Sequence, residues 1–372
     1  MSRTPPLTRR RLLSGLGSGL AAVPLLGRAA ARAAETADPA GRKLLFVIGA
    51  TGGASIIDSF LPVTLDEVPM DAQVEGLNAY DPALVVQPPG SALRCVAPLE
   101  DTLFLTPGYT IAEFLEAHYA DLTVVAHEVT SVNHAVAQKR SMTGAGINRG
   151  RTIAEAVAER HGAGLPLANC NMATGGYLES GDDPDLPATA RSELIADPSM
   201  YALSTHGWRG MPGPYEPGQL QAARQIRERL EDVSPFGRTF AGSPLRSAYL
   251  QVRRDVAPEL EELDALSKLM LLPNDAVSAN LGLAASDVTD DVRSTFAGID
   301  DDGWAQQGAL AFLLAFHGLS CASTISLAFE PHFSGDDITG APLAFDFSHT
   351  AHRPAQNVMW GRVLQVVHGL VT

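Results

Sequence analysis

The stretch KLLFVIGATGGASIIDSFLP (43–62) decides the fold. Its first part, 43–50, is apolar after the opening lysine, which is typical of a strand buried on both faces of a parallel sheet. A glycine-rich turn follows, and Pro62 and Pro69 then prevent a long helix from beginning there. A dinucleotide-binding turn needs such a helix, and it needs a glycine where this chain has Ser55. The turn therefore disfavours a nucleotide cofactor, and a nucleotide-dependent oxidoreductase is the weakest of three hypotheses.

The glycines of this turn have another use, because they let the backbone leave the strand sharply. Asp58 then comes to the edge of the sheet, where it is expected to face the crevice as an oxygen ligand or a polar anchor. The alternative is that Asp58 caps a local turn, as most loop aspartates do. Ligands of open α/β sheets bind at the carboxyl ends of the strands, so functional residues are expected directly after each strand.

The rest of the chain alternates short apolar runs with amphipathic segments. Strands are predicted at 43–50, 122–129, 165–172 and 323–329. Helices are predicted at 110–120, 151–162, 219–233, about 246–272, 303–319 and 355–371. Apolar strands separated by helices predict an α/β three-layer sandwich with a mostly parallel sheet. Within the second helix, the stripe at helical spacing that is expected to pack in the core consists of Ile153, Ala156, Val157 and Arg160.

The N-terminus has the pattern of an export signal. Arg9 and Arg10 are followed by two leucines, a weakly apolar stretch and small residues of the A-x-A type. The alternative, a membrane anchor, is disfavoured because glycines and Pro24 interrupt an apolar stretch that is shorter than the roughly 20 residues of a span. We therefore predict a twin-arginine signal at 1–33 and a single domain at 34–372.

The composition, with 45% hydrophobic and 19% charged residues, predicts a globular chain. The formal charge is −15, and it becomes −21 without the six arginines of residues 1–33. So acidic a chain is unsuited to nucleic acid, since binding phosphates needs clustered basic residues. The three cysteines, Cys95, Cys170 and Cys321, form no C-x-x-C motif, and the last two lie in apolar runs. They are expected in the core, and which of them could pair in a disulfide stays open.

Several motifs resemble one protein family. The opening turn is similar to a Gly-Gly-Pro-Ser-x-x-Asp-x-Phe-x-Pro pattern, matched here by Gly52, Gly53, Ser55, Asp58, Phe60 and Pro62, with Ala54 in place of the proline. A later block resembles a strand followed by Asn-His and Thr-Gly, matched by Asn133, His134, Thr143 and Gly144. Near the end, Asp346 and His349 are the nearest match to an Asp-Thr-His segment. The family consists of uncharacterised, twin-arginine-exported bacterial proteins related to the alkaline phosphatase and sulfatase-like superfamily.

This resemblance implies an alkaline-phosphatase-like sandwich that is exported to the periplasm or beyond and carries a metal centre. The family continues past its last helix to a Glu-Phe-Gly-Arg-Thr segment and an Asp-His pair, whereas this chain ends at Thr372. The domain is therefore expected to be shortened at its C-terminus.

The candidate metal ligands are Asp58, Asp346, His349 and His352. Carboxylates and imidazoles suit zinc, manganese or calcium, depending on their mixture. The last three lie within one short segment, so a loop or one helix face could bring them together. The alternative is a polar loop with surface histidines.

The candidate catalytic residues are His134, which could be a ligand or orient an oxyanion, and Thr143, a nucleophile if a metal activates its hydroxyl. The alternatives are a loop histidine bonded to backbone and a threonine that caps a turn.

The leading hypothesis is an exported, metal-dependent hydrolase of small phosphate or sulfate esters, without a membrane span after signal cleavage. The second is a non-catalytic exported binding or assembly protein with a protein partner on the same fold.

Overall fold

The computed structural model describes residues 43–50, 52–71, 79–99, 108–125, 131, 133–143, 150–206, 217–247, 249–251, 253–254, 268–271, 287–300, 302–326, 345–349 and 351–372. The expected signal, residues 1–33, lies outside this set. No helix among the described residues is long and apolar enough to cross a membrane.

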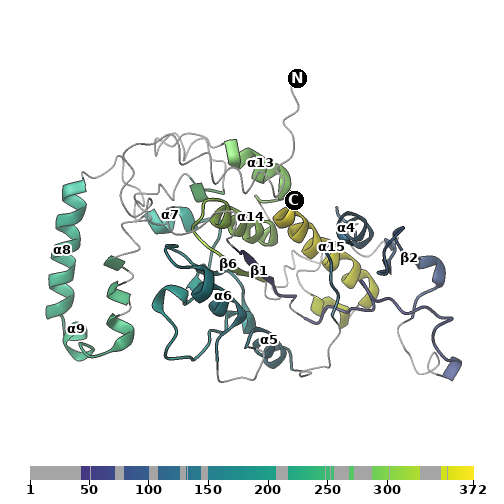
Figure 1. Cartoon of the computed structure of the whole chain (residues 1–372), viewed down its shortest axis with the longest axis horizontal. Helices are drawn as coiled ribbons and strands as arrows, with labels where there is room; N and C mark the ends of the chain where they lie inside the picture. Colours follow the sequence, from purple (N-terminus) through teal and green to yellow (C-terminus); the bar gives the residue numbers. More distant parts are fainter. Residues whose placement is uncertain are drawn as a thin grey trace, which may run out of the picture.

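The centre of the molecule is a four-stranded parallel sheet (Figure 1). Its strands, in spatial order, are β1 (Leu45–Ile48), β6 (Ala322–Ile325), β4 (Asn169–Asn171) and β5 (Glu193–Leu194). β6 lies between β1 and β4, so a strand from the last part of the chain pairs with two from the first half. The chain is therefore an α/β protein with a mostly parallel sheet, as the sequence predicts. A separate antiparallel pair joins β2 (Val85–Val86) to β3 (Cys95–Val96).

Three of the four predicted strand segments contain a strand of this sheet, and the fourth is wrong where it can be checked. Residues 122–125 form no strand, and 126–129 lie outside the described residues. Leu122 and Val124 instead pack against a cluster of side chains on the last helix and its neighbours. The alternation of apolar residues there thus reflects packing on helices, without a partner strand.

The helices match the predicted segments closely, with additions. The described ones are α4 (Ile111–His118), α5 (His134–Thr143), α6 (Ile153–His161), α7 (Tyr201–His206), α8 (Pro217–Val233), α9 (Pro235–Thr239), α13 (Asp287–Thr295), α14 (Gly303–Phe316) and α15 (His352–Val371). Of the segment predicted at 246–272, the described residues up to 254 are helical, whereas 255–267 lie outside the set. α4 and α6 each begin at a capping box, in which Thr110 and Thr152 bond reciprocally with the glutamate three residues on.

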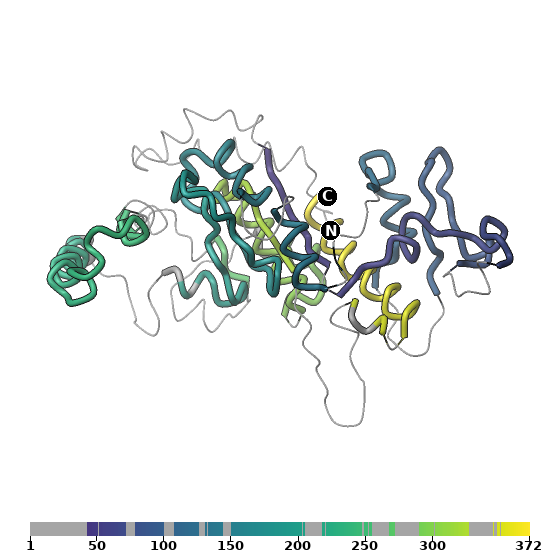
Figure 2. Tube along the Cα trace, turned by 90° about the horizontal axis from the view of Figure 1, so that it is seen from below, coloured from purple at the N-terminus to yellow at the C-terminus, as the bar shows by residue number. Residues whose placement is uncertain are grey.

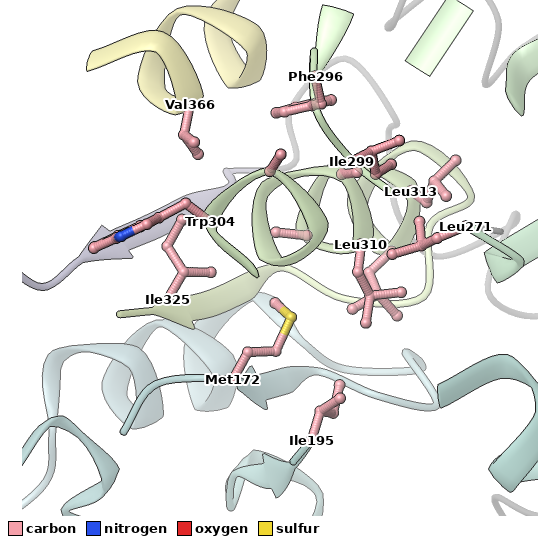
Figure 3. Close-up of a cluster of buried hydrophobic side chains, with 14 of the residues drawn as sticks. Met172, Ile195, Leu271, Phe296, Ile299, Trp304, Leu310, Leu313, Ile325 and Val366 are labelled. Carbon is pink, nitrogen blue, oxygen red and sulfur yellow. The ribbon is translucent and has the colours of Figure 1, made fainter. Parts of the chain in front are cut away.

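The core lies around α14, which is buried on nearly all sides. Figure 3 shows the helix between side chains of α15 and the segment after α13, such as Val366 and Phe296, and side chains of the sheet region, such as Met172 and Ile325. α6 packs on other residues of the sheet, where Ala154 and Ala158 belong to one buried cluster with Ala322.

The stripe predicted for α6 is wrong except for Val157, which is partly buried against this cluster. The buried residues of α6 are Ala154, Glu155 and Ala158, whereas Ile153 is 53% exposed. The small alanines let the helix backbone pack close to the sheet, and this close packing places the larger Ile153 on the solvent side of the helix. Glu155 is fully buried because its carboxylate serves the cap and also accepts hydrogen bonds from the Gly181 N–H.

A further cluster joins α4 and β3 to α15, with Phe60, Phe114 and Leu364 among its members. Figure 2 shows α15 between the sheet and the part of the chain that carries α4 and β2. His118 and His368 join α4 to α15 through their ring nitrogens, 2.8 Å apart. Cys95 lies in this cluster, and all three cysteines are buried and free, as expected of core residues.

Candidate functional site

The carboxyl ends of β1, β4 and β6 lie along one edge of the sheet, because the strands are parallel. The segments that follow them are hydrogen-bonded to one another. Gly49 donates its N–H to the carbonyl of Ile325 at 2.8 Å. The Tyr177 hydroxyl, from the 3-10 helix η4 (Gly175–Leu178) after β4, donates to the carbonyl of Ala50 at 3.2 Å. This edge is where the sequence predicts functional residues.

The glycine-rich turn leaves β1 sharply, with Gly52 and Gly53 at φ of +96° and +92°. No helix begins in the segment 52–62, so the geometry of a dinucleotide turn is absent from these residues. Gln356 of α15 holds the turn instead. Its amide accepts from the N–H of Ser55 at 2.8 Å and donates to the carbonyl of Gly53 at 3.1 Å. Trp360 donates its indole N–H to the carbonyl of Ser55 at 3.1 Å.

Asp58 is buried at this junction, with 2% of its surface exposed. One carboxylate oxygen accepts a hydrogen bond from the hydroxyl of Tyr80, and the other accepts from Nε2 of His352 at 2.9 Å. The guanidinium of Arg353 lies 4.2 Å from the centre of the Tyr80 ring and donates to the carbonyl of Ala79. The aspartate thus connects the turn to the first residues of α15.

The electrostatics of this group keep the carboxylate charged. Burial raises the pKa of Asp58, but hydrogen bonds from Ser55, Tyr80 and His352, with the charge of His352, outweigh burial and hold the pKa below its ordinary value. Burial, and then the bond to Asp58, raise the pKa of Tyr80, which therefore remains a hydroxyl donor. His352 has 45% of its side chain exposed, so one side of its ring faces solvent.

His134 and His349 form a second pair. Their ring centroids are 6.2 Å apart, and the ring planes differ by 8°. His134 is the first residue of α5, and α5 packs on η4. In this contact Gln138 of α5 accepts a hydrogen bond from the Gly176 N–H of η4 at 2.8 Å. His349 ends the 3-10 helix η6 (Phe345–His349), and both histidines are exposed. The fold therefore brings together two of the predicted site residues from opposite halves of the chain.

Thr143 lies away from this pair. It is the last residue of α5, and its hydroxyl donates to the carbonyl of Lys139 at 3.1 Å. At about 1.5 Å of rise per residue, α5 places Thr143 about 13 Å along its axis from His134. The two cannot contact one reacting atom in this arrangement, so a nucleophilic role for Thr143 stays a prediction that the geometry does not favour.

The two imidazoles are stacked and lie close enough to share a metal ion once their side chains rotate. Such a rotation is needed because a tetrahedral zinc ion with ligands at about 2.0–2.1 Å holds two imidazole centroids only about 5 Å apart, and because the lone pairs of two stacked rings do not converge. Imidazoles suit zinc or manganese better than calcium. Asp346 is in the same 3-10 helix as His349, but its side chain lies outside what the structure describes. Among the described residues, no three histidine, cysteine or acidic side chains are grouped to hold a metal.

Four residues of the site escaped the sequence analysis, namely Tyr80, Arg353, Gln356 and Trp360. One signal could have found two of them, because His352, Gln356 and Trp360 are spaced by four and so lie on one face of α15. Three side chains with hydrogen-bonding nitrogens on one face of a helix indicate that this face can bond to polar backbone. No comparable signal exists for Tyr80, whose position depends on the path of the chain after the turn.

Comparison with models of known protein families, with curated proteins and with solved structures finds no match to this chain.

Proposed function

We propose that this chain is an exported protein with an alkaline-phosphatase-like three-layer sandwich, and that His134 and His349 bind a divalent transition metal at the carboxyl edge of its sheet. The proposed activity is hydrolysis of a small phosphate or sulfate ester. The observation that carries the proposal is the 6.2 Å approach of these two imidazoles, from segments that are distant in sequence. The position of the pair supports it further, since ligands of parallel sheets bind at this edge.

The bound metal would polarise an ester oxygen and stabilise the leaving group. His134 and His349 would hold it, and Asp346, three residues before His349 in the sequence, is the candidate carboxylate. His352 has a separate part. An ionised Asp58 accepts the proton on Nε2, so a neutral His352 ring has its lone pair on Nδ1. The Nε2 atom of His352 is therefore engaged by Asp58.

The second candidate is a non-catalytic exported binding or assembly protein on the same fold. One observation favours it: Asp58 is bonded within the protein on both oxygens, by Tyr80 and by His352. A carboxylate used in this way secures the turn to α15, and it supplies no obvious ligand to a metal at the histidine pair.

Two measurements separate the candidates. Calorimetric titration of the purified chain with zinc and with manganese is expected to give saturable binding that His134→Ala and His349→Ala each abolish. His161→Ala, at the end of α6, removes a histidine elsewhere and should leave binding unchanged. Turnover of p-nitrophenyl phosphate or sulfate by the metal-loaded protein would support the hydrolase. Metal binding without turnover would favour the binding protein, and no saturable binding would contradict the metal site.

Export is a separate part of the proposal, and it has its own test. Residues 1–33 fused to a folded reporter should carry it out of the cytoplasm, and Arg9→Lys with Arg10→Lys should block that transport. Transport that persists in the double variant would contradict the twin-arginine signal.

A further inference from the structure

The described residues between 217 and 254 form a helical arm at one end of the molecule (Figures 1 and 2). It consists of α8, α9 and the helical residues 244–247, 249–251 and 253–254. The connection after α8 is tight, because the Ser234 hydroxyl donates to the carbonyl of Glu231 at 2.7 Å and accepts from the Gly237 N–H at 2.8 Å. The ion pairs that hold the returning helix to α8 are Arg246–Asp232, Arg253–Glu231 and Arg254–Glu228.

The outer side of α8 is apolar and exposed. Ile226, Leu230 and Val233 follow one another at spacings of four and three residues, and they are 56%, 63% and 63% exposed. Phe236, 66% exposed, extends this stripe to the tip of the arm, where its ring packs against Phe240 with centroids 4.8 Å apart. Monomeric soluble proteins seldom expose a continuous row of large apolar side chains, so this one indicates a binding surface.

The stripe lies opposite the side of α8 that pairs with the returning helix. At about 100° per residue, Glu228 and Asp232 come about 160° around α8 from Leu230, and Glu231 comes about 100° from it. Arg227 and Arg229 are placed by the same geometry on the two flanks of the stripe. The outer edge of α8 is thus an apolar row between arginines.

The charge of the arm is opposite to that of the chain. Residues 217–254 contain seven arginines and three acidic residues, a formal charge of +4, whereas the whole chain carries −15. Each of the three acidic residues pairs with an arginine of the arm, so the excess is carried by the other four: Arg224, Arg227, Arg229 and Arg238. Positive charge is therefore concentrated on the element that also exposes the apolar row.

We propose that the outer edge of α8 binds an anionic lipid surface. A helix with an apolar face bordered by arginines lies in the plane of a bilayer interface, with its apolar side chains among the upper acyl chains and its basic side chains at the headgroups. The exposed phenylalanines at the tip add apolar area to this contact. A second copy of the chain fits less well, because two α8 edges placed face to face bring Arg227 and Arg229 against their own counterparts. This surface is independent of the proposed metal site.

Vesicle co-sedimentation of the full chain tests the proposal. Binding is expected to vesicles that contain phosphatidylglycerol and to be at least tenfold weaker to phosphatidylcholine alone, and it should weaken with added salt. Arg227→Gln with Arg229→Gln should weaken binding by about 30-fold, since each basic residue near such a surface contributes about 1 kcal/mol. Leu230→Ser with Phe236→Ser should weaken it by at least about tenfold.

Two control variants change similar residues elsewhere. Met70→Ser removes an apolar side chain that is 81% exposed, and Arg160→Gln removes an exposed arginine of α6. Both should bind vesicles as the unaltered chain does, and circular dichroism should show that the arm variants keep the fold.

Three results would overturn the proposal. These are no binding to anionic vesicles at low salt, equal binding to both kinds of vesicle, and binding that neither arm variant weakens. Light scattering gives a further check: a dimer that dissociates in the arm variants would assign the surface to a second copy and would also overturn it.

Discussion

Replacing Asp58 with alanine should lower the free energy of unfolding by about 4 kcal/mol. Two losses add to this figure. The charge-assisted hydrogen bond from Tyr80 contributes about 1.5–3 kcal/mol, and the tyrosine hydroxyl, on a fully buried residue, then loses its partner at a cost of about 1–3 kcal/mol. His352 adds little, because its side chain is 45% exposed and solvent screens its ion pair. The free energy of unfolding of a typical domain is only about 5–15 kcal/mol, so the folded state of the variant should be only marginally stable.

Urea denaturation followed by circular dichroism measures this change, and a double-mutant cycle apportions it. The coupling energy between Asp58→Asn and Tyr80→Phe should be about 1–2 kcal/mol, larger than the coupling between Asp58→Asn and His352→Gln. Asp66→Ala, an exposed aspartate nearby, should change stability by less than about 0.5 kcal/mol. A loss below about 1 kcal/mol in Asp58→Ala, or a stronger coupling to His352 than to Tyr80, would refute the reasoning.

Two further predictions concern the core and pH. Gly308→Ala should destabilise the protein by about 1–3 kcal/mol, because the new Cβ would lie 2.7 Å from a methyl carbon of Val366. The control Gly218→Ala meets no neighbouring atom and should be neutral or stabilising. Equal denaturant midpoints for the two variants would contradict this prediction. Burial, with the charge of Lys268, lowers the pKa of His317 to about 4, below its value of about 6.5 in the unfolded chain. The unfolded chain therefore binds a proton more readily than the folded one. The free energy of unfolding should accordingly fall by about 2 kcal/mol as the pH drops from 7 to 4.5. Unfolding curves of the wild type and of His317→Gln at both pH values check this, and the same loss in the variant would count against it.

The strands of the sheet were predictable because burial on both faces leaves a strong signal in the sequence. The runs that contain β1 and β6 consist of apolar residues and small hydroxyl residues after the opening lysine, the run of β4 also holds two buried asparagines, and the helices between the runs indicate parallel pairing. β5 escaped prediction because both of its residues are exposed at the sheet's edge. A strand was wrongly predicted at 122–125 because its alternating side chains pack on helices and not within a sheet.

The candidate site was predictable in its location more than in its contacts. The rule that functional residues follow parallel strands places Asp58 after β1, whereas residues 122–125 do not form the strand that was expected ahead of His134. It does not reveal that His134 would meet His349, because such a meeting depends on how α5 and η6 approach each other in space. The hydrogen bond between Tyr80 and Asp58 could not be predicted from the sequence either, because Tyr80 lies in a segment without a motif. Local patterns specify elements, whereas contacts between distant segments follow from the packing of the whole chain.

Metal content, measured by elemental mass spectrometry on the purified, folded chain, shows whether His134 and His349 form a metal site. We expect near-stoichiometric zinc or manganese, before or after reconstitution, that is lost in His134→Ala and in His349→Ala and kept in His161→Ala. Folded wild-type protein that holds no metal even after reconstitution would contradict it.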